Sequence, residues 1–335
     1  MRILHLLSSP VWSGPAEPVA LLAEAQRALG HTVSVAIDST RSGTGSEEAA
    51  APRLEALGLL DRSGLRLCTR DGPGGLWRDA RRLGTLEADV VHSHFSHDHW
   101  VAALSGHHGL RVRSFHAARS RRLLRPPASA FTVPTPALGV GLRRPFMVLP
   151  PLVAPAFVPA ADRAALQRAL GLTAPVVGMV STFQASRRHA LALAAFGRLQ
   201  APGATLVLVG DGQLGPELRA EAQRRGLGSR VRFPGYQRGE ALVRWMQAFD
   251  ELWVLGLGND GAGRAVVQGR AVGARVVAVD EGPLSIWADV VLPEPTPEAL
   301  VAVALRGERR SVALPDVRAV AGELLGLYRR AGARA

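Results

Sequence analysis

Residues 252–264 read LWVLGLGNDGAGR, and residues 273–280 read GARVVAVD. This pattern is typical of a buried strand, a glycine-rich turn, a helix and a second buried strand. Such a turn places free backbone N–H groups at the positive end of a helix, which is an arrangement that binds phosphate. The stretch also carries two polar side chains eight positions apart, Asp260 and Gln268. It therefore predicts an anion site within a parallel α/β domain.

The rest of the chain repeats this alternation. Short runs rich in β-branched residues alternate with amphipathic helical runs, which indicates parallel sheets covered by helices on both faces. The expected strands are 2–7, 32–37, 89–92, 111–115, 146–149, 175–181, 204–209, 230–234, 251–255, 275–279 and 289–292. These are too many for one comfortable sheet. We therefore predict an α/β protein with two doubly wound, Rossmann-like domains that face a cleft.

Pro150 and Pro151 mark the expected joint, because proline interrupts both helices and strands. We predict an N-terminal Rossmann-like domain over residues 1–150 and a C-terminal one over residues 151–310. Residues 311–335 are expected to form a final helix without a following strand. That helix is available to pack back across the joint.

The composition excludes several kinds of chemistry. All 40 basic residues are arginine and the net charge is +12, so a lysine Schiff base or a P-loop lysine is impossible, and basic phosphate contacts must use guanidinium groups. The charge is spread over both halves, which argues against a nucleic-acid partner. The single Cys68 excludes an intramolecular disulfide and a thiolate metal site. Without a signal peptide or a long apolar run, we expect a cytoplasmic protein.

Three further motifs carry a family resemblance. They are LVLVGDG at 206–212, RVRFPGY at 230–236 and the stretch STFQASRRHALALAAF at 181–196. In this order and spacing, the second half resembles the donor domain of the retaining glycosyltransferases of family four, which have the two-domain GT-B fold. The first half agrees more loosely, through its first strand and the loop that follows.

The resemblance implies a nucleotide-sugar donor, UDP- or GDP-linked, as co-substrate and no other cofactor. It places the turn at Gly210, Asp211 and Gly212 under the nucleotide, and Gly235 and Tyr236 around the base. A basic pair that meets the diphosphate in the family falls on Thr182 and Arg187. The first of these is lost here, while the second is kept as arginine and backed by Arg188.

The paired glutamates of the family fall on Asp260 and Gln268, in a degenerate form of the Glu-x7-Glu motif. Between them, Gly261, Ala262 and Gly263 supply N–H groups at a helix start, where the charge of the leaving diphosphate develops. In the first domain, Gly14 matches a glycine loop that approaches the phosphates, and His116 matches the histidine that faces the reacting sugar.

These positions imply a retaining, metal-independent transfer, with His116, Asp260 and Arg187 in the reaction. No Asp-x-Asp motif occurs, which agrees with a site that binds no metal. The changes at Asp260 and Gln268 also allow a second interpretation, a catalytically impaired protein that binds a nucleotide sugar. A third is an NAD-dependent oxidoreductase, because residues 256–261 spell G-x-G-x-x-G.

Two polar clusters remain open. The stretch 92–100, HSHFSHDHW, has alternative interpretations as a metal site, as a lining for the acceptor and as helix capping. The acid-free arginine run Arg111–Arg125 is either a solvated face, a site for an anionic acceptor or a peripheral contact with the inner membrane face. The acceptor is expected to be a glycan, a lipid-linked molecule or a small molecule, and not a nucleic acid.

Overall fold

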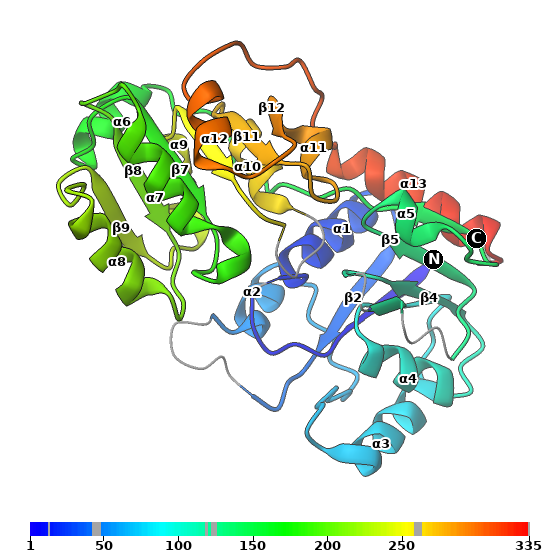
Figure 1. The fold of residues 1–335 in the computed structure, drawn as a ribbon. Helices are drawn as coiled ribbons and strands as arrows, with labels where there is room; N and C mark the ends of the chain where they lie inside the picture. The colour runs from blue at the N-terminus through cyan, green and yellow to red at the C-terminus, as the bar shows by residue number, and fades with distance from the viewer. Residues whose placement is uncertain (13, 42–47, 118–119, 122–125, 258–262, 334–335) are drawn as a thin grey trace. The chain divides into compact units, whose positions relative to one another are not determined.

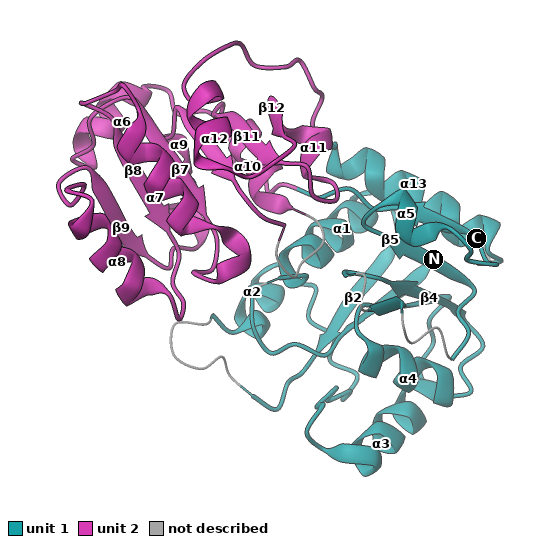
Figure 2. Ribbon diagram, viewed as in Figure 1, with its two compact units in different colours: residues 1–152, 315–335 teal, residues 153–314 magenta. Residues whose placement is uncertain are grey.

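The computed structural model describes residues 1–12, 14–41, 48–117, 120–121, 126–257 and 263–333. The chain forms two compact units, Met1–Leu152 with Pro315–Ala335 and Val153–Leu314 (Figure 2). It enters the second unit directly after Pro150 and Pro151, where the sequence predicts a joint. The last segment returns to the first unit.

The first unit is built on a parallel sheet, which has six strands among the described residues, in the order β2-β1-β3-β4-β5-β6 (Figure 1). These strands are β1 Arg2–Leu7, β2 Thr32–Ile37, β3 Val90–Ser93, β4 Leu110–Ser114, β5 Ala130–Val133 and β6 Phe146–Val148. The helices are α1 Ala16–Ala28, α2 Ala50–Ala56, α3 Gly72–Gly84, α4 Ser96–Leu104, α5 Pro136–Gly139 and α13 Val317–Arg330.

Helices cover both faces of this sheet. The side chains of β1 alternate between the two faces and contribute to the core on each. Ile3 and Leu7 belong to a core shared with α1, α2 and α13. Leu4 and Leu6 belong to a second core shared with α3 and α4. His5 lies between Ile3 and Leu7 in the alternation, so it points to the face of α1 and α13. Asp316 caps α13 by accepting a hydrogen bond from the Ala319 N–H at 2.6 Å.

The second unit repeats the plan, with the described strands in the order β12-β11-β10-β7-β8-β9. The strands are β7 Val176–Val180, β8 Thr205–Val209, β9 Val231–Gly235, β10 Glu251–Val254, β11 Arg275–Val279 and β12 Val290–Leu292. The helices are α6 Arg163–Ala169, η2 Ala185–Arg187, α7 His189–Arg198, α8 Gly215–Arg224, α9 Gly239–Gln247, α10 Arg264–Ala271, α11 Leu284–Trp287 and α12 Pro297–Val303.

Every residue of β8, β10 and β11 is buried, as expected for parallel strands covered on both faces. Helices α7, α8 and α12 form one layer against the sheet, and α6, α9 and α10 form another. The fold class predicted from the sequence is therefore confirmed. Among the described residues, no helix is both long and apolar enough to cross a membrane.

The element predictions missed one strand and three short helices of the described residues, η2, α5 and α11. Strand β5 was not expected, because its four residues AFTV are too few to show a period and prolines lie on both sides of them. Helices α5 and α11 have four residues each, which is one helical turn and too short for an amphipathic pattern. With this strand, the described sheet of the first unit has six strands, as many as that of the second unit.

Candidate functional site

The second sheet has a topological switch point between β7 and β10. The chain moves outward from β7 to β8 and β9, and then returns to β10 on the other side of β7. The loops that follow β7 and β10 therefore depart in opposite directions. In open α/β sheets, ligands bind at this point outside the carboxyl ends of the strands. Most of the predicted donor-site residues follow strands at this edge.

Two glycines allow the loop after β8 to lie against the loop after β7. Gly210 has a φ of +144° and Gly212 a φ of +153°. A Cβ atom on Gly210 would lie 2.0 Å from the carbonyl oxygen of Ser181, and one on Gly212 would lie 2.7 Å from that of Phe183. Larger residues are excluded at both positions by this close approach. Asp211 between them is exposed, and its Oδ1 accepts the Gly212 N–H at 2.7 Å.

The loop after β9 joins the same edge. The Gly210 N–H donates to the carbonyl oxygen of Gly235 at 2.9 Å, and Gly235 has a φ of +80°. Tyr236, the next residue, keeps 46% of its surface exposed. The structure therefore brings the predicted residues of these two turns together.

Arg187 and Arg188 hold the loop after β10. The Nη1 of Arg187 donates to the carbonyl oxygens of Gly256 at 2.9 Å and Leu257 at 2.8 Å. The Nη1 of Arg188 donates to the carbonyl oxygen of Leu255. The Nε of Arg187 is buried and has no hydrogen-bond partner among the described residues. A buried guanidinium N–H without a partner is a donor that an anion would satisfy.

Glu281 completes this arrangement, and the sequence analysis missed it. Its Oε1 pairs with Nη2 of Arg188 at 2.7 Å, and its Oε2 accepts the Leu257 N–H at 3.0 Å. Burial opposes ionisation of Glu281, but the Leu257 N–H and the Arg188 guanidinium outweigh it and hold the pKa of the carboxyl below its usual value. The sequence signal that could have identified Glu281 is an acidic residue two positions after β11, at the same edge of the sheet.

Helix α10 begins at this edge. Gly263 is its N-cap with a φ of +64°, and a Cβ atom there would lie 2.4 Å from Leu284 Cδ2. Gln268 is buried within the helix, with 6% of its surface exposed. Asp260, Gly261 and Ala262 lie outside the described residues. The G-x-G-x-x-G stretch follows β10 rather than β7, the first strand of the unit, which disfavours the NAD interpretation.

The first sheet has its own switch point, between β1 and β3. Gly14 lies in the loop after β1 and has a φ of +54°. His116 lies just after β4 and is half-buried. The residues expected at the phosphate loop and at the sugar therefore lie on the same carboxyl edge of this sheet.

His116 ends a chain of buried polar side chains that the sequence analysis did not connect. Its Nε2 lies 3.3 Å from Nδ1 of His94, whose Nε2 lies 3.0 Å from Nδ1 of His5. The Nε2 of His5 lies 2.9 Å from Oε1 of Gln26. Burial lowers the pKa of His5 and of His116 to about 4, and that of His94 well below its usual value. These imidazoles are therefore neutral near pH 7.

The metal interpretation of the histidine cluster has a geometric basis in His5, His92 and His94. One nitrogen from each lies within 4.8 Å of the others. However, both ring nitrogens of each residue have protein partners. Those of His92 are Oη of Tyr328 at 2.7 Å and Oγ of Ser114 at 2.8 Å. A hydrogen-bond network therefore accounts for all three residues as they stand.

Two other residues of this stretch, His99 and Asp98, bond neighbouring backbone and side-chain groups of the fold. His99 bonds the carbonyl oxygen of Pro126 through Nε2 at 2.8 Å and Oγ of Ser93 through Nδ1 at 3.1 Å. Asp98 is buried and accepts the N–H groups of Ser8 at 3.0 Å and Phe95 at 2.8 Å. Burial raises the pKa of Asp98 to about 7.

The described members of the arginine run do not all lie at the surface. Arg113 is buried and donates to Oγ of Ser96 at 3.2 Å. Arg121 donates to the carbonyl oxygen of Val140. Arg111 is partly buried, and the members at 119, 122 and 125 lie outside the described residues. Arg113 therefore takes no part in the predicted contact with a membrane or an anionic acceptor.

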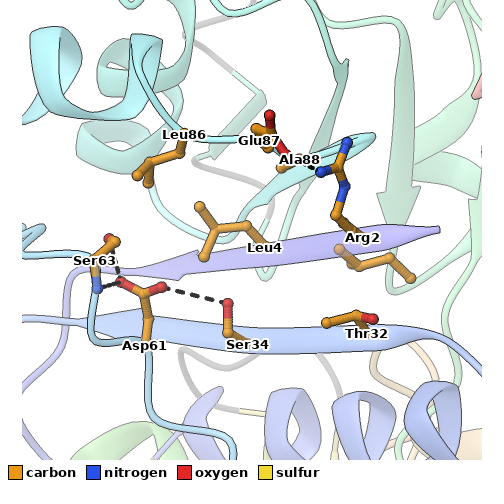
Figure 3. Close-up of a pocket in the computed structure, with 10 residues that line it drawn as sticks. Arg2, Leu4, Thr32, Ser34, Asp61, Ser63, Leu86, Glu87 and Ala88 are labelled. Atoms are coloured by element: carbon orange, nitrogen blue, oxygen red, sulfur yellow. Dashed lines mark hydrogen bonds and ion pairs between the residues drawn. The ribbon is translucent and has the colours of Figure 1, made fainter.

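A small cavity of about 200 Å³ opens at the opposite edge of the first sheet (Figure 3). It lies among the first residues of β1 and β2, at the amino ends of the strands. Its polar groups are paired with one another: Asp61 accepts from Ser63 N–H at 3.1 Å and from Ser34 Oγ at 3.4 Å, and Arg2 pairs with Glu87. This position and these pairs do not favour a ligand site.

In comparisons with known proteins, each half of the chain matches a family model. Residues 12–144 match the family model described as Glycosyltransferase Family 4, and residues 174–306 match the one described as Glycosyl transferases group 1. No curated protein matches the chain at a significant level.

Solved structures of the same fold cover nearly the whole chain. HepE from Anabaena in complex with UDP is 19% identical over 90% of this chain and 88% of its own, with a TM-score of 0.71. Sucrose-phosphate synthase from Thermosynechococcus elongatus is 18% identical over 98% and 99%, with a TM-score of 0.71. The catalytic domain of starch synthase IV from Arabidopsis thaliana, bound to ADP and acarbose, is 15% identical over 100% of both chains, with a TM-score of 0.65. These likenesses show the GT-B fold.

Proposed function

Since this chain is a glycosyltransferase of the GT-B fold, we propose that it moves a sugar from a UDP- or GDP-linked donor to an acceptor, with retention of the anomeric configuration and without a metal ion. The acceptor is a glycan, a lipid-linked molecule or a small molecule. The reaction takes place in the cytoplasm. HepE is described in complex with UDP-glucose and starch synthase IV with ADP, which supports a nucleoside diphosphate as the leaving group.

The buried Nε–H of Arg187, which has no partner in the part of the chain that the structure describes, is the observation that carries this proposal. Breaking the anomeric C–O bond leaves negative charge on the diphosphate, and without a metal that charge needs fixed donors. Arg187 at the switch point and the N-terminus of α10 supply donors of this kind. His116 contacts the sugar, Asp260 holds its hydroxyl groups, and Gln268 accepts from the ribose.

The turns at Gly210–Gly212 and Gly235–Tyr236 carry the nucleoside in this proposal. The glycines of the first turn lie close against the loop after β7, and the Gly210 N–H bonds the carbonyl oxygen of Gly235, so the two turns form a rigid edge for a planar base. Gly14 serves the phosphates from the first unit. A peripheral membrane contact would rest on the arginines near Arg111, and co-sedimentation with anionic vesicles tests it.

A panel of UDP- and GDP-sugars in a thermal-shift assay tests the proposal. We expect one donor to raise the Tm, and the same donor to release its nucleotide slowly by hydrolysis in the presence of EDTA. Arg187→Gln should abolish the shift. Arg198→Gln is the matched control, since Arg198 ends α7 in an exposed pair with Glu298. Equal shifts for both variants would remove Arg187 from the site.

A second candidate is a protein that binds the donor without transferring the sugar. It is favoured by Gln268, which is buried and carries no charge where the family has glutamate. A donor-dependent thermal shift without release of nucleotide, in the presence of any acceptor of the three classes, would select this candidate. The anomeric configuration of a transferred product, read by NMR, decides the retaining mechanism.

A further inference from the structure

We propose that Gln26 and Tyr328 set the tautomer of His116, through His5 and His94, so that His116 presents Nδ1 as a hydrogen-bond acceptor. The inference concerns the first unit alone and deepens the proposed function by assigning positioning residues to His116. The role of His116 at the sugar rests on that proposed function, whereas the tautomer itself does not.

The polarity of the chain follows from the Gln26 amide. Its Oε1, which can only accept, faces Nε2 of His5 at 2.9 Å, so His5 carries its proton on Nε2. Neutral His5 must then accept through Nδ1 from the Nε2–H of His94, at 3.0 Å. By the same logic, His94 accepts through Nδ1 from the Nε2–H of His116, at 3.3 Å. All three rings are therefore protonated at Nε2 and unprotonated at Nδ1.

In this orientation the other end of the amide bonds Tyr328. The Nε2 of Gln26, which can only donate, faces Oη of Tyr328 at 3.4 Å. The same hydroxyl lies 2.7 Å from Nδ1 of His92, which accepts its proton. His92 then donates through Nε2 to Oγ of Ser114 at 2.8 Å. The C-terminal helix α13 thus anchors one end of the network, and His116 forms the other end.

Burial makes the tautomers well defined. His5 and His94 are buried, and desolvation disfavours the imidazolium form of each, as it does for His116. A neutral imidazole can hold only one proton, so the donor and acceptor roles in the chain are coupled. Nδ1 is the nitrogen of His116 outside this chain of bonds. In the proposed function it accepts from a sugar hydroxyl, whose proton it orients.

The tautomers can be read directly in long-range ¹H–¹⁵N spectra of the full chain labelled with ¹⁵N-histidine. Loss of one signal set in His116→Gln assigns His116 among the ten histidines. We expect protonated Nε2 and unprotonated Nδ1 in His116, His94 and His5 between about pH 6 and 8. His107 is an internal reference, since its Nε2 bonds the Leu86 carbonyl oxygen and its Nδ1 accepts the Gly109 N–H. His116 protonated at Nδ1 would overturn the inference.

Tyr328→Phe removes only the hydroxyl and tests the anchor. We expect His116 to lose its single tautomer and to show averaged signals, while His107 stays unchanged. Gln26→Leu should do the same if Tyr328→Phe proves poorly folded. An unchanged His116 in a folded variant of either kind would contradict the assignment. Stoichiometric zinc in the wild type that is lost in His5→Gln would also overturn it, since a metal would occupy these nitrogens.

Sugar transfer is measured separately from the tautomer of His116, so the proposed function and this inference can each be contradicted without the other. If transfer occurs, Tyr328→Phe should lower kcat about tenfold, which corresponds to one oriented hydrogen bond, with little change in the KM for the donor. The expected tautomer without any transfer would sink the proposed function alone. Transfer by a protein whose His116 carries its proton on Nδ1 would sink this inference alone.

Discussion

Arg188 and Glu281 form an ion pair with 2.7 Å between Nη2 and Oε1, and this pair joins the loop after β7 to the loop after β11. The carboxylate also accepts the N–H of Leu257, in the loop after β10. Three loops at the switch point of the second sheet are therefore held by one acidic side chain. The proposed diphosphate site at Arg187 depends on this positioning.

Glu281→Gln should weaken nucleotide binding more than it weakens the fold. The glutamine can still accept the Leu257 N–H, but it loses the charge opposite Arg188. Because both side chains are about one-third exposed, we expect a loss of about 1 kcal/mol, or roughly fivefold in Kd. Isothermal titration with UDP or GDP measures it. Glu298→Gln, which breaks an exposed pair with Arg198, is the control, and equal Kd values for the two would contradict the prediction.

Gly210→Ala should destabilise the second unit. The new methyl group would meet the Ser181 carbonyl oxygen at 2.0 Å, in a backbone conformation with a φ of +144°. Overpacking and strain together predict a loss of about 2–4 kcal/mol in the free energy of unfolding. Gly197→Ala in α7 is the matched control. Its Cβ would meet Leu227 at an ordinary 3.5 Å, so a gain of about 0.5–1 kcal/mol is expected in urea unfolding. A stable Gly210→Ala protein would show that the two loops can separate.

Gln268→Glu should tighten nucleotide binding and lower the stability of the free protein. The side chain is buried, so a carboxylate there is costly until a donor pairs with it. A charge-assisted bond to ribose hydroxyls would then improve Kd by about fivefold, since such bonds contribute about 1 kcal/mol more than neutral ones. Titration with UDP or GDP, and Tm values with and without nucleotide, check both effects. Weaker binding in the variant would remove Gln268 from the nucleoside site.

Acid should destabilise the first unit between about pH 6.5 and pH 4. In the fold the pKa of His5 and of His116 is about 4, below the ordinary 6.5, so the unfolded chain takes up more protons in this window. The contribution of these imidazoles to stability is therefore full above pH 6.5 and is lost as the pH falls, by up to roughly 3 kcal/mol for each imidazole. Asp98, with its pKa raised to about 7, gives the opposite slope between about pH 4 and 7.

Urea unfolding at several pH values separates these contributions. His5→Gln should remove part of the acid sensitivity and leave the slope of Asp98 in place. His31→Gln is a control, because His31 is an accessible residue whose pKa is lowered only by partial burial and by nearby positive charge. The same acid sensitivity in His5→Gln as in the wild type would show that the network does not control it.

Helices and strands could be predicted from the sequence where their local residue pattern matches their burial in the fold. The run TLVLV of β8 is apolar throughout, and its burial on both faces matches that pattern. Arg187 was predicted as a site residue from its motif, and it lies in the loop after β7. The four residues of β5 could not be found, because so short a strand is defined by pairing with β4 and β6 rather than by its own sequence.

The sequence by itself determined two doubly wound α/β halves, arginine as the only strong cation and the glycines at the turns, because these depend on period, composition and backbone freedom. Only the tertiary structure decided the partners of the polar side chains. Gln26 and Tyr328 are 302 positions apart yet share a hydrogen bond, and Glu281 meets Arg188 across the sheet edge. Such pairs arise when parallel strands and returning helices bring distant residues together in a dry interior, and no local pattern records them.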